Sequence, residues 1–258
     1  MNYTTYDLIQ FPSDEIDVSL KIKGNTLYFK LYKDLNKSVI AGLIAIAKLR
    51  ELYSEITVIM PFLAYSRSDS HSIISILQSL GVSRLITVEI HSENIHSGIE
   101  IYNITIIPEV IEKIGIDLKE LVLISPDNGG IARVKNAADI LNCRFISMEK
   151  TRENMRIKHS LNNQELVKNR PTFIVDDIID SCGTINSAAE VLINCGAKSV
   201  KVLGIHGVLS KREFSPLIDK IYITNTIEQN DHNEKISLLN VDRIIHSKSD
   251  NLLVKFVK

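Results

Sequence analysis

The sequence has little cysteine, almost no net charge and no long apolar run. Its 258 residues include three cysteines, Cys143, Cys182 and Cys195, with no CxxC spacing between them. Three cysteines cannot all pair, which suits a reducing compartment, and we expect a cytoplasmic protein. The formal net charge of −1 supplies no field that would attract nucleic acid or an anionic membrane. Any phosphate chemistry must therefore come from local groups.

Membrane and targeting segments are also missing from the sequence. No apolar run reaches the roughly 18 residues that a membrane span requires. The first ten residues, MNYTTYDLIQ, lack a basic region followed by an apolar one. We therefore expect a soluble, unprocessed chain with no membrane partner. The 45% hydrophobic content supports a large core, and the length favours two α/β subdomains, which we place at residues 1–117 and 118–258.

Short runs rich in Val and Ile recur along the chain and are separated by helical stretches. The runs span 56–62, 85–90, 121–125, 172–178, 199–205 and 220–224. They do not alternate apolar with polar residues, which is typical of strands covered on both faces in a parallel sheet. Residues 35–53 and 184–196 have helical patterns, and the second ends on Gly196, a good left-handed cap. The order predicts doubly wound sheets, which bind ligands at the carboxyl ends of their strands.

The segment FIVDDIIDSCGT, residues 173–184, places three aspartates, Asp176, Asp177 and Asp180, at the end of such a run. The following residues, Ser181 to Thr184, are small and lead into a helix. Backbone N–H groups of this turn and of the helix amino end can surround a phosphate dianion. Carboxylates repel phosphate, so the aspartates suit sugar hydroxyls or a divalent cation. This pattern favours a sugar phosphate, but an acidic pocket for Mg²⁺ alone and a turn without a ligand stay open.

VDDIIDSCGT resembles the phosphoribosyl-diphosphate (PRPP) fingerprint that type I phosphoribosyltransferases share with PRPP synthetases. Other segments select the synthetase family, ribose-phosphate diphosphokinase. They occur in family order and are MPFLAYSRSDS (60–70), VEIHSEN (88–94), SPDNGGIARV (125–134), EKTREN (149–154) and GIHGVLS (204–210). Six ordered segments are far more specific than any one of them. The resemblance implies two phosphoribosyltransferase-like, Rossmann-like subdomains, each with a mostly parallel sheet flanked by helices, in a homo-oligomer built from dimers, such as a hexamer.

The resemblance also implies a reaction and its residues. The family transfers the β,γ-diphosphate of ATP to the C1 hydroxyl of ribose 5-phosphate, using Mg²⁺. Lys150 and Arg152 would act on the transferring group, from a polar stretch that lacks clear periodicity and that we expect to be a mobile loop. His91 and Asp127 would hold the metal. ATP would be bound by Phe11, Glu15, Arg67, Ser68 and Asp69, and ribose 5-phosphate by Asp176, Asp177, Asp180, Ser181, Cys182, Gly183 and Thr184.

Departures from the family pattern concentrate in the ATP half. The family's R-Q-D-R is here Arg67-Ser68-Asp69-Ser70, its F-x-D-G-E is FPSDE at 11–15, and the loop after Ser70 is shortened. In the phosphate turn Cys182 replaces a glycine, which is tolerable only if the position needs neither positive φ nor the closest ligand approach. Two alternatives to the family reaction stay open. One is diphosphate transfer to a larger acceptor such as ADP-ribose, and the other is a catalytically silent, ligand-binding or regulatory member.

Overall fold

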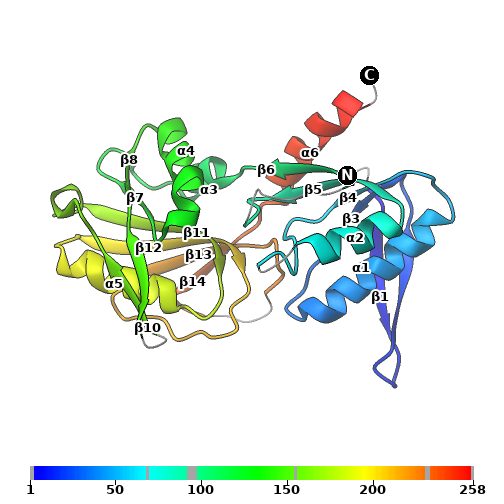
Figure 1. The fold of residues 1–258 in the computed structure, drawn as a ribbon, viewed down its shortest axis with the longest axis horizontal. Helices are drawn as coiled ribbons and strands as arrows, with labels where there is room; N and C mark the ends of the chain where they lie inside the picture. The colour runs from blue at the N-terminus through cyan, green and yellow to red at the C-terminus, as the bar shows by residue number, and fades with distance from the viewer. Residues whose placement is uncertain (1–2, 68–69, 92–97, 154–155, 230–232, 257–258) are drawn as a thin grey trace. The chain divides into compact units, whose positions relative to one another are not determined.

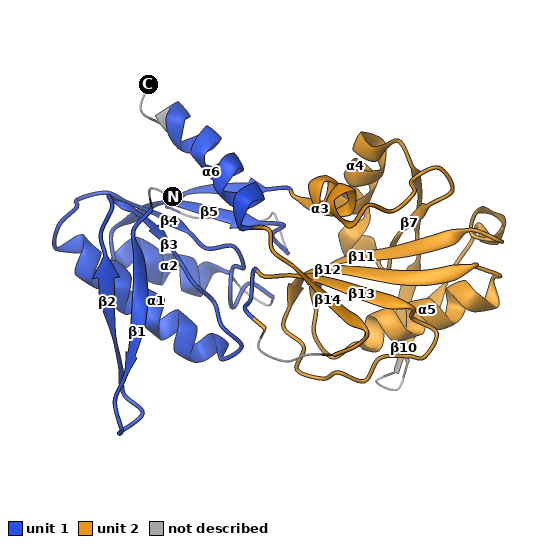
Figure 2. Cartoon of the chain, turned by 180° about the vertical axis from the view of Figure 1, so that it is seen from behind, with its two compact units in different colours: residues 1–105, 226–228, 242–258 blue, residues 106–225, 229–241 orange. Residues whose placement is uncertain are grey.

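The computed structural model describes residues 3–67, 70–91, 98–153, 156–229 and 233–256 (Figure 1). They form two compact units, coloured separately in Figure 2. Unit 1 comprises Met1–Thr105, Thr226–Glu228 and Asp242–Lys258, and unit 2 comprises Ile106–Asn225 and Gln229–Val241. The chain therefore returns to unit 1 with its last helix. The division at residues 117 and 118 stays a prediction.

Unit 1 is built on a four-stranded parallel sheet in the order β3-β4-β5-β6, beside an antiparallel hairpin of β1 and β2. The strands are β1 Thr5–Gln10, β2 Ile16–Lys21, β3 Thr26–Tyr28, β4 Ile56–Ile59, β5 Val82–Val88 and β6 Glu100–Ile104. The helices are α1 Leu35–Arg50, α2 His71–Ser79 and α6 Asp242–Phe256. Helix α1 begins where the Asp34 carboxylate accepts the Lys37 N–H, and it buries Val39, Ile46 and Leu49.

Unit 2 contains a six-stranded, fully parallel sheet in the order β14-β13-β12-β11-β7-β8. Its strands are β7 Val122–Ser125, β8 Arg144–Ser147, β11 Pro171–Ile179, β12 Ser199–Gly207, β13 Lys220–Thr224 and β14 Ile236–Leu239. Its helices are α3 Ile107–Ile114, α4 Ile131–Leu141 and α5 Gly183–Asn194, with short 3-10 turns η1 Asn128–Gly130 and η2 Gln164–Leu166. The central strands β7, β11 and β12 are buried, which explains their continuous apolar sequences.

The α/β fold class and the six predicted strand runs are confirmed, and Gly196 adopts the expected left-handed conformation with φ 82°. The prediction of a mobile loop around Lys150 was wrong. Strands β9 (Glu149–Glu153) and β10 (Arg156–Ser160) form an antiparallel hairpin there. In the described part of β10, the alternation of buried and exposed side chains extends only over Ile157 and the buried His159. This pattern is too short to predict a strand from sequence. No helix among the described residues is long and apolar enough to cross a membrane.

Candidate functional site

The three aspartates of the acidic segment lie along and just beyond the carboxyl end of β11. Strand β7 pairs with β11 only from Thr172 to Ile174, whereas β11 continues to Ile179. Asp176 and Asp177 therefore extend past the end of the neighbouring strand, as the rule for parallel sheets predicts for a ligand site. Side chains alternate between the two faces of a strand, yet those of Asp176 and Asp177 approach each other closely enough for a side-chain hydrogen bond. Asp176 is half-buried and Asp177 is buried.

Asp177 is fixed by an arginine that approaches from α4. The Arg133 guanidinium lies 3.1 Å from Asp177 Oδ1, and only 12% and 5% of the two side chains are exposed. A buried carboxylate and a buried guanidinium each cost free energy to desolvate, so each depends on the other. The ion pair makes Asp177 a fixed negative charge behind the strand edge.

Asp176 carries a proton more readily than an ordinary aspartate. Burial is the main cause that raises the pKa of Asp176 well above 3.8, and the neighbouring Asp177 carboxylate raises it further. Asp127 acts in the same direction and Arg133 acts against it. The Oδ1 atom of Asp176 also accepts the backbone N–H of Asp177 at 3.0 Å. A carboxyl group that carries a proton can both donate to and accept from a sugar hydroxyl.

The turn from β11 into α5 has the geometry of an anion site. Helix α5 begins at Gly183, and the side chain of its N-cap residue, Cys182, makes no capping hydrogen bond. The first N–H groups of a helix have no acceptor within it, so those of α5 can serve an external acceptor. Cys182 has φ 65°, so the position does require the conformation that glycine adopts most easily. Cys182 is only 3% exposed, so its side chain does not occupy the exposed side of the turn.

Two contacts hold this turn to the segment after β12. The Asp180 Oδ1 atom accepts the Ser210 N–H at 3.1 Å. The Cys182 thiol donates to the Lys211 carbonyl at 3.2 Å. Burial is the main cause that raises the pKa of this thiol to about 11, which keeps it protonated and unreactive. Asp180 and Cys182 thus anchor the turn to the segment that follows β12.

A second acidic group lies just beyond β7. Asp127 Oδ1 accepts the Gly129 N–H at 3.0 Å and so caps η1, while Asp127 Oδ2 lies 2.9 Å from the Lys150 Nζ atom. Gly130 is required here, since a Cβ would come within 2.7 Å of the Ser125 Oγ atom. Lys150 reaches Asp127 from β9. Arg152 lies on the same strand, and its side chain lies outside the described part of the chain.

The residues predicted to bind ATP lie in unit 1. Phe11 and Glu15 close the turn of the β1–β2 hairpin, where the Phe11 N–H donates to the Glu15 carbonyl at 2.9 Å. Phe11 is 46% exposed, which excludes the alternative of an ordinary core residue. Arg67 and His91 are exposed as well, and Ser68 and Asp69 lie outside the described residues. His91 belongs to unit 1 and Asp127 to unit 2, so their pairing stays a prediction.

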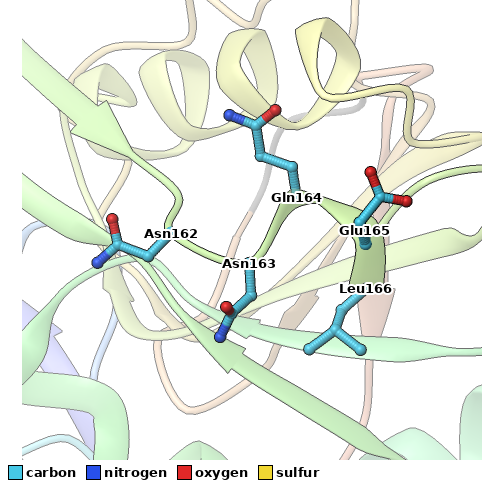
Figure 3. A pocket seen from close by; sticks show the side chains of 5 residues that line it. All are labelled: Asn162, Asn163, Gln164, Glu165 and Leu166. Carbon is cyan, nitrogen blue, oxygen red and sulfur yellow. The ribbon is translucent and has the colours of Figure 1, made fainter.

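An open depression of about 550 Å³ lies at the segment that connects β10 to β11 (Figure 3). Its lining consists of Asn162, Asn163, Gln164, Glu165 and Leu166. Their side chains fan out in different directions in Figure 3 and do not converge on one point. It includes none of the predicted site residues, and we do not regard it as a functional site.

Comparison with known proteins decides the family. A model of the phosphoribosyl transferase domain matches residues 91–242, more than half of the chain. The ribose-phosphate pyrophosphokinase of Mycoplasma genitalium is 31% identical over 239 residues, which cover 83% of this chain and 71% of that protein. The chain belongs to the ribose-phosphate pyrophosphokinase family.

Two further comparisons extend over nearly the whole chain. The ribose-phosphate pyrophosphokinase of Wolinella succinogenes is 28% identical over 266 residues, which cover 92% of this chain and 86% of that protein. The crystal structure of the phosphoribosylpyrophosphate synthetase from Mycobacterium smegmatis superposes with a TM-score of 0.77. It covers 96% of this chain and 91% of that chain at 23% identity, which supports the shared fold. The predicted family resemblance and the predicted fold are confirmed.

In this pyrophosphokinase-family chain, unit 2 brings together one half of the predicted site. Asp127, Asp176 and Asp177 lie close enough for the charges of the other two to raise the pKa of Asp176, and Lys150 lies against Asp127. Sequence reasoning gave no role to Arg133, although it lies in the quoted segment SPDNGGIARV. The signal that could have suggested a role for Arg133 is its position in a motif that the chain combines with a pair of aspartates, because a buried aspartate needs a cation.

Family membership implies magnesium, and the donor groups of unit 2 suit it. No group of three His, Cys, Asp or Glu side chains gathers as a metal site within the described ranges. Mg²⁺ usually takes only one or two carboxylates and completes its shell with water and substrate phosphates. Asp127 is such a carboxylate, since its side chain is partly exposed and its Oδ2 already attracts a cation, Lys150. Asp127 therefore fits a Mg²⁺ ion that binds together with the nucleotide phosphates.

Proposed function

We propose that the protein transfers the β,γ-diphosphate of ATP to the C1 hydroxyl of ribose 5-phosphate, giving PRPP and AMP. The observation that carries this proposal is the amino end of α5, which the Cys182 side chain does not cap and which directly follows the acidic edge of β11. The relatives named ribose-phosphate pyrophosphokinase favour this acceptor over ADP-ribose. No feature of the described residues favours the larger acceptor.

The C1 hydroxyl oxygen attacks the β-phosphorus of ATP. The bond between that phosphorus and the oxygen bridging to the α-phosphate breaks, AMP leaves with the electron pair, and the hydroxyl proton passes to solvent. Negative charge gathers on the phosphate oxygens, so fixed cations and good positioning lower the barrier most. Magnesium supplies charge neutralisation on these oxygens when it is bound, and we assign Asp127 and His91 to hold it.

We assign the 5-phosphate to the turn Ser181–Thr184 and the ribose hydroxyls to the β11 edge. Asp176 is half-buried and can exchange hydrogen bonds with a hydroxyl, whereas Asp177 is buried against Arg133 and supplies a fixed charge. Asp180 supports the turn through Ser210. The Asp176 carboxyl group thus faces a neutral hydroxyl, and the N–H groups of α5 face the phosphate dianion.

We assign Lys150 and Arg152 to the transferring diphosphate and Phe11, Glu15, Arg67, Ser68 and Asp69 to ATP. Phe11 is exposed at a hairpin tip, as a residue that stacks on a base would be. We further propose a homo-oligomer in which this hairpin serves the adenine site of a neighbouring subunit, so a lone subunit would be inactive. The three cysteines are free in the structure, in keeping with a cytoplasmic location.

An acceptor-dependent AMP assay tests the proposal. Purified protein with ATP and Mg²⁺ should release AMP when ribose 5-phosphate is added, with PRPP formed in equal amount. ATP alone is the blank, and ADP-ribose is the competing acceptor. AMP release with ADP-ribose only would replace the acceptor, and no AMP with either sugar would favour the silent, ligand-binding alternative.

A further inference from the structure

A buried histidine lies opposite Lys150 in the β9–β10 hairpin. His159 is the direct cross-strand partner of Lys150, and only 9% of it is exposed. Side chains of directly opposed residues in an antiparallel pair lie on the same face. His159 and Lys150 therefore project together from the hairpin. Lys150 reaches Asp127, and His159 reaches α5.

Two hydrogen bonds join the hairpin to the first turns of α5 through one serine. The Ser187 hydroxyl donates to the Ile157 carbonyl at 3.1 Å, and the His159 Nδ1 atom lies 3.0 Å from the Ser187 Oγ atom. A hydroxyl has a single proton, so Nδ1 is the donor in the second bond. Ser187 thus accepts from one residue of β10 and donates to another.

The same strand also packs on the phosphate turn. A Cβ at Gly183 would come within 3.3 Å of the Ile157 Cδ1 atom, so Ile157 lies directly against the first residue of α5. The hairpin that carries Lys150 therefore rests on the turn that we assign to the 5-phosphate. The pKa of His159 is lowered chiefly by burial and then by the charge of Lys150. A neutral imidazole can lie beside the Lys150 ammonium without repulsion.

We propose that His159, held by Ser187, is a positioning residue for diphosphate transfer. It docks the β9–β10 hairpin on the amino end of α5 and so places the Lys150 ammonium where the diphosphate is transferred. This inference rests on the proposed function for its catalytic consequence, but the docking is a property of unit 2 alone. Without the bonds to Ser187, β10 would keep the Ile157 packing but lose this polar anchor on α5, and Lys150 would sample more positions.

The kinetic test uses three variants and two controls. Ser187→Ala and His159→Leu should lower kcat for AMP release about tenfold to a hundredfold, since misplacement of a catalytic group has costs of that order. The KM for ribose 5-phosphate should change little, because the turn itself is intact. His159→Asn should recover most of the activity, since its amide N–H can replace Nδ1. The exposed neighbours Ser160→Ala on β10 and Glu190→Ala on α5 should behave as wild type.

Hydrogen exchange separates this inference from the proposed function. In Ser187→Ala and His159→Leu, backbone N–H groups of β9 and β10 should exchange faster, with β11 unchanged. This measurement is informative even if the wild-type protein releases no AMP, in which case the proposed function fails and the docking still stands or falls by itself. Unchanged exchange in Ser187→Ala would overturn the docking. An unchanged kcat, or His159→Asn as impaired as His159→Leu, would overturn the positioning role.

Discussion

The Lys150 Nζ atom lies 2.9 Å from the Asp127 Oδ2 atom, so the cation that we assign to the reaction is paired with the carboxylate that we assign to magnesium. The exposed fractions of the two side chains are 19% and 30%, so water screens the pair only in part. An ion bound to Asp127 would neutralise the carboxylate in place of Lys150. The ammonium would then be available to phosphate oxygens.

Lys150→Ala should lower kcat for AMP release about a hundredfold or more, because one positioned charge at a developing oxyanion has an effect of this size. Its effect on stability should be small, since a partly exposed ion pair contributes little. Steady-state kinetics and thermal unfolding measure the two effects. Lys135→Ala is a matched control, because Lys135 forms an exposed pair with Asp139 on α4. A loss of less than tenfold would remove Lys150 from the mechanism.

Arg133→Met should destabilise the protein by about 3 to 5 kcal/mol, because it leaves the buried Asp177 carboxylate without its cation. Adding Asp177→Asn should restore part of the loss, since the double variant has no unpaired charge. Urea unfolding of the two single variants and the double variant gives the coupling free energy. Lys135→Met, on an exposed face of the same helix, should cost far less. Additive effects would contradict the ion pair as a coupled unit.

The acidic strand edge and the small-residue turn that follows it could be predicted as local structure, because local sequence determines both. A buried parallel strand requires a continuous apolar run such as the one before Asp176, and a tight strand-to-helix turn requires small residues. The hairpin of Lys150 could not be predicted, because contacts of Ile157 and His159 with α5 stabilise it. Those contacts join segments that are distant in sequence.

Pairings between distant segments also limited the prediction of individual roles. The effect of Arg133 on Asp177 depends on α4 lying beside β11, which no local pattern reports. A cysteine at position 182 was judged tolerable only if that position does not need positive φ, yet Cys182 has φ 65° and turns its side chain into the core. The predicted partnership of His91 and Asp127 joins the two units and stays a prediction.

Asp176→Asn should stabilise the protein increasingly as pH rises. The folded-state pKa of Asp176 is raised above its ordinary value of 3.8, so the folded protein holds a proton that the unfolded chain releases. The stability due to this proton is present below pH 3.8 and is lost as pH rises through the folded-state pKa. The Tm difference between Asp176→Asn and wild type should be smallest near pH 4 and grow toward pH 8. Asp139→Asn, exposed on α4, controls for net charge, and a difference independent of pH would contradict the raised pKa.

Cys182→Gly should be more stable than Cys182→Ala, although alanine keeps more of the buried volume. Both variants lose the thiol contact with the Lys211 carbonyl. Alanine keeps the cost of φ 65°, about 1 to 2 kcal/mol for a residue with a Cβ, whereas glycine adopts this conformation freely. Urea unfolding of wild type and both variants measures the order, and Cys195→Ala with Cys195→Gly, at φ −83°, provides the matched pair in which alanine should be the more stable. If alanine is also the more stable at position 182, backbone strain does not govern this turn.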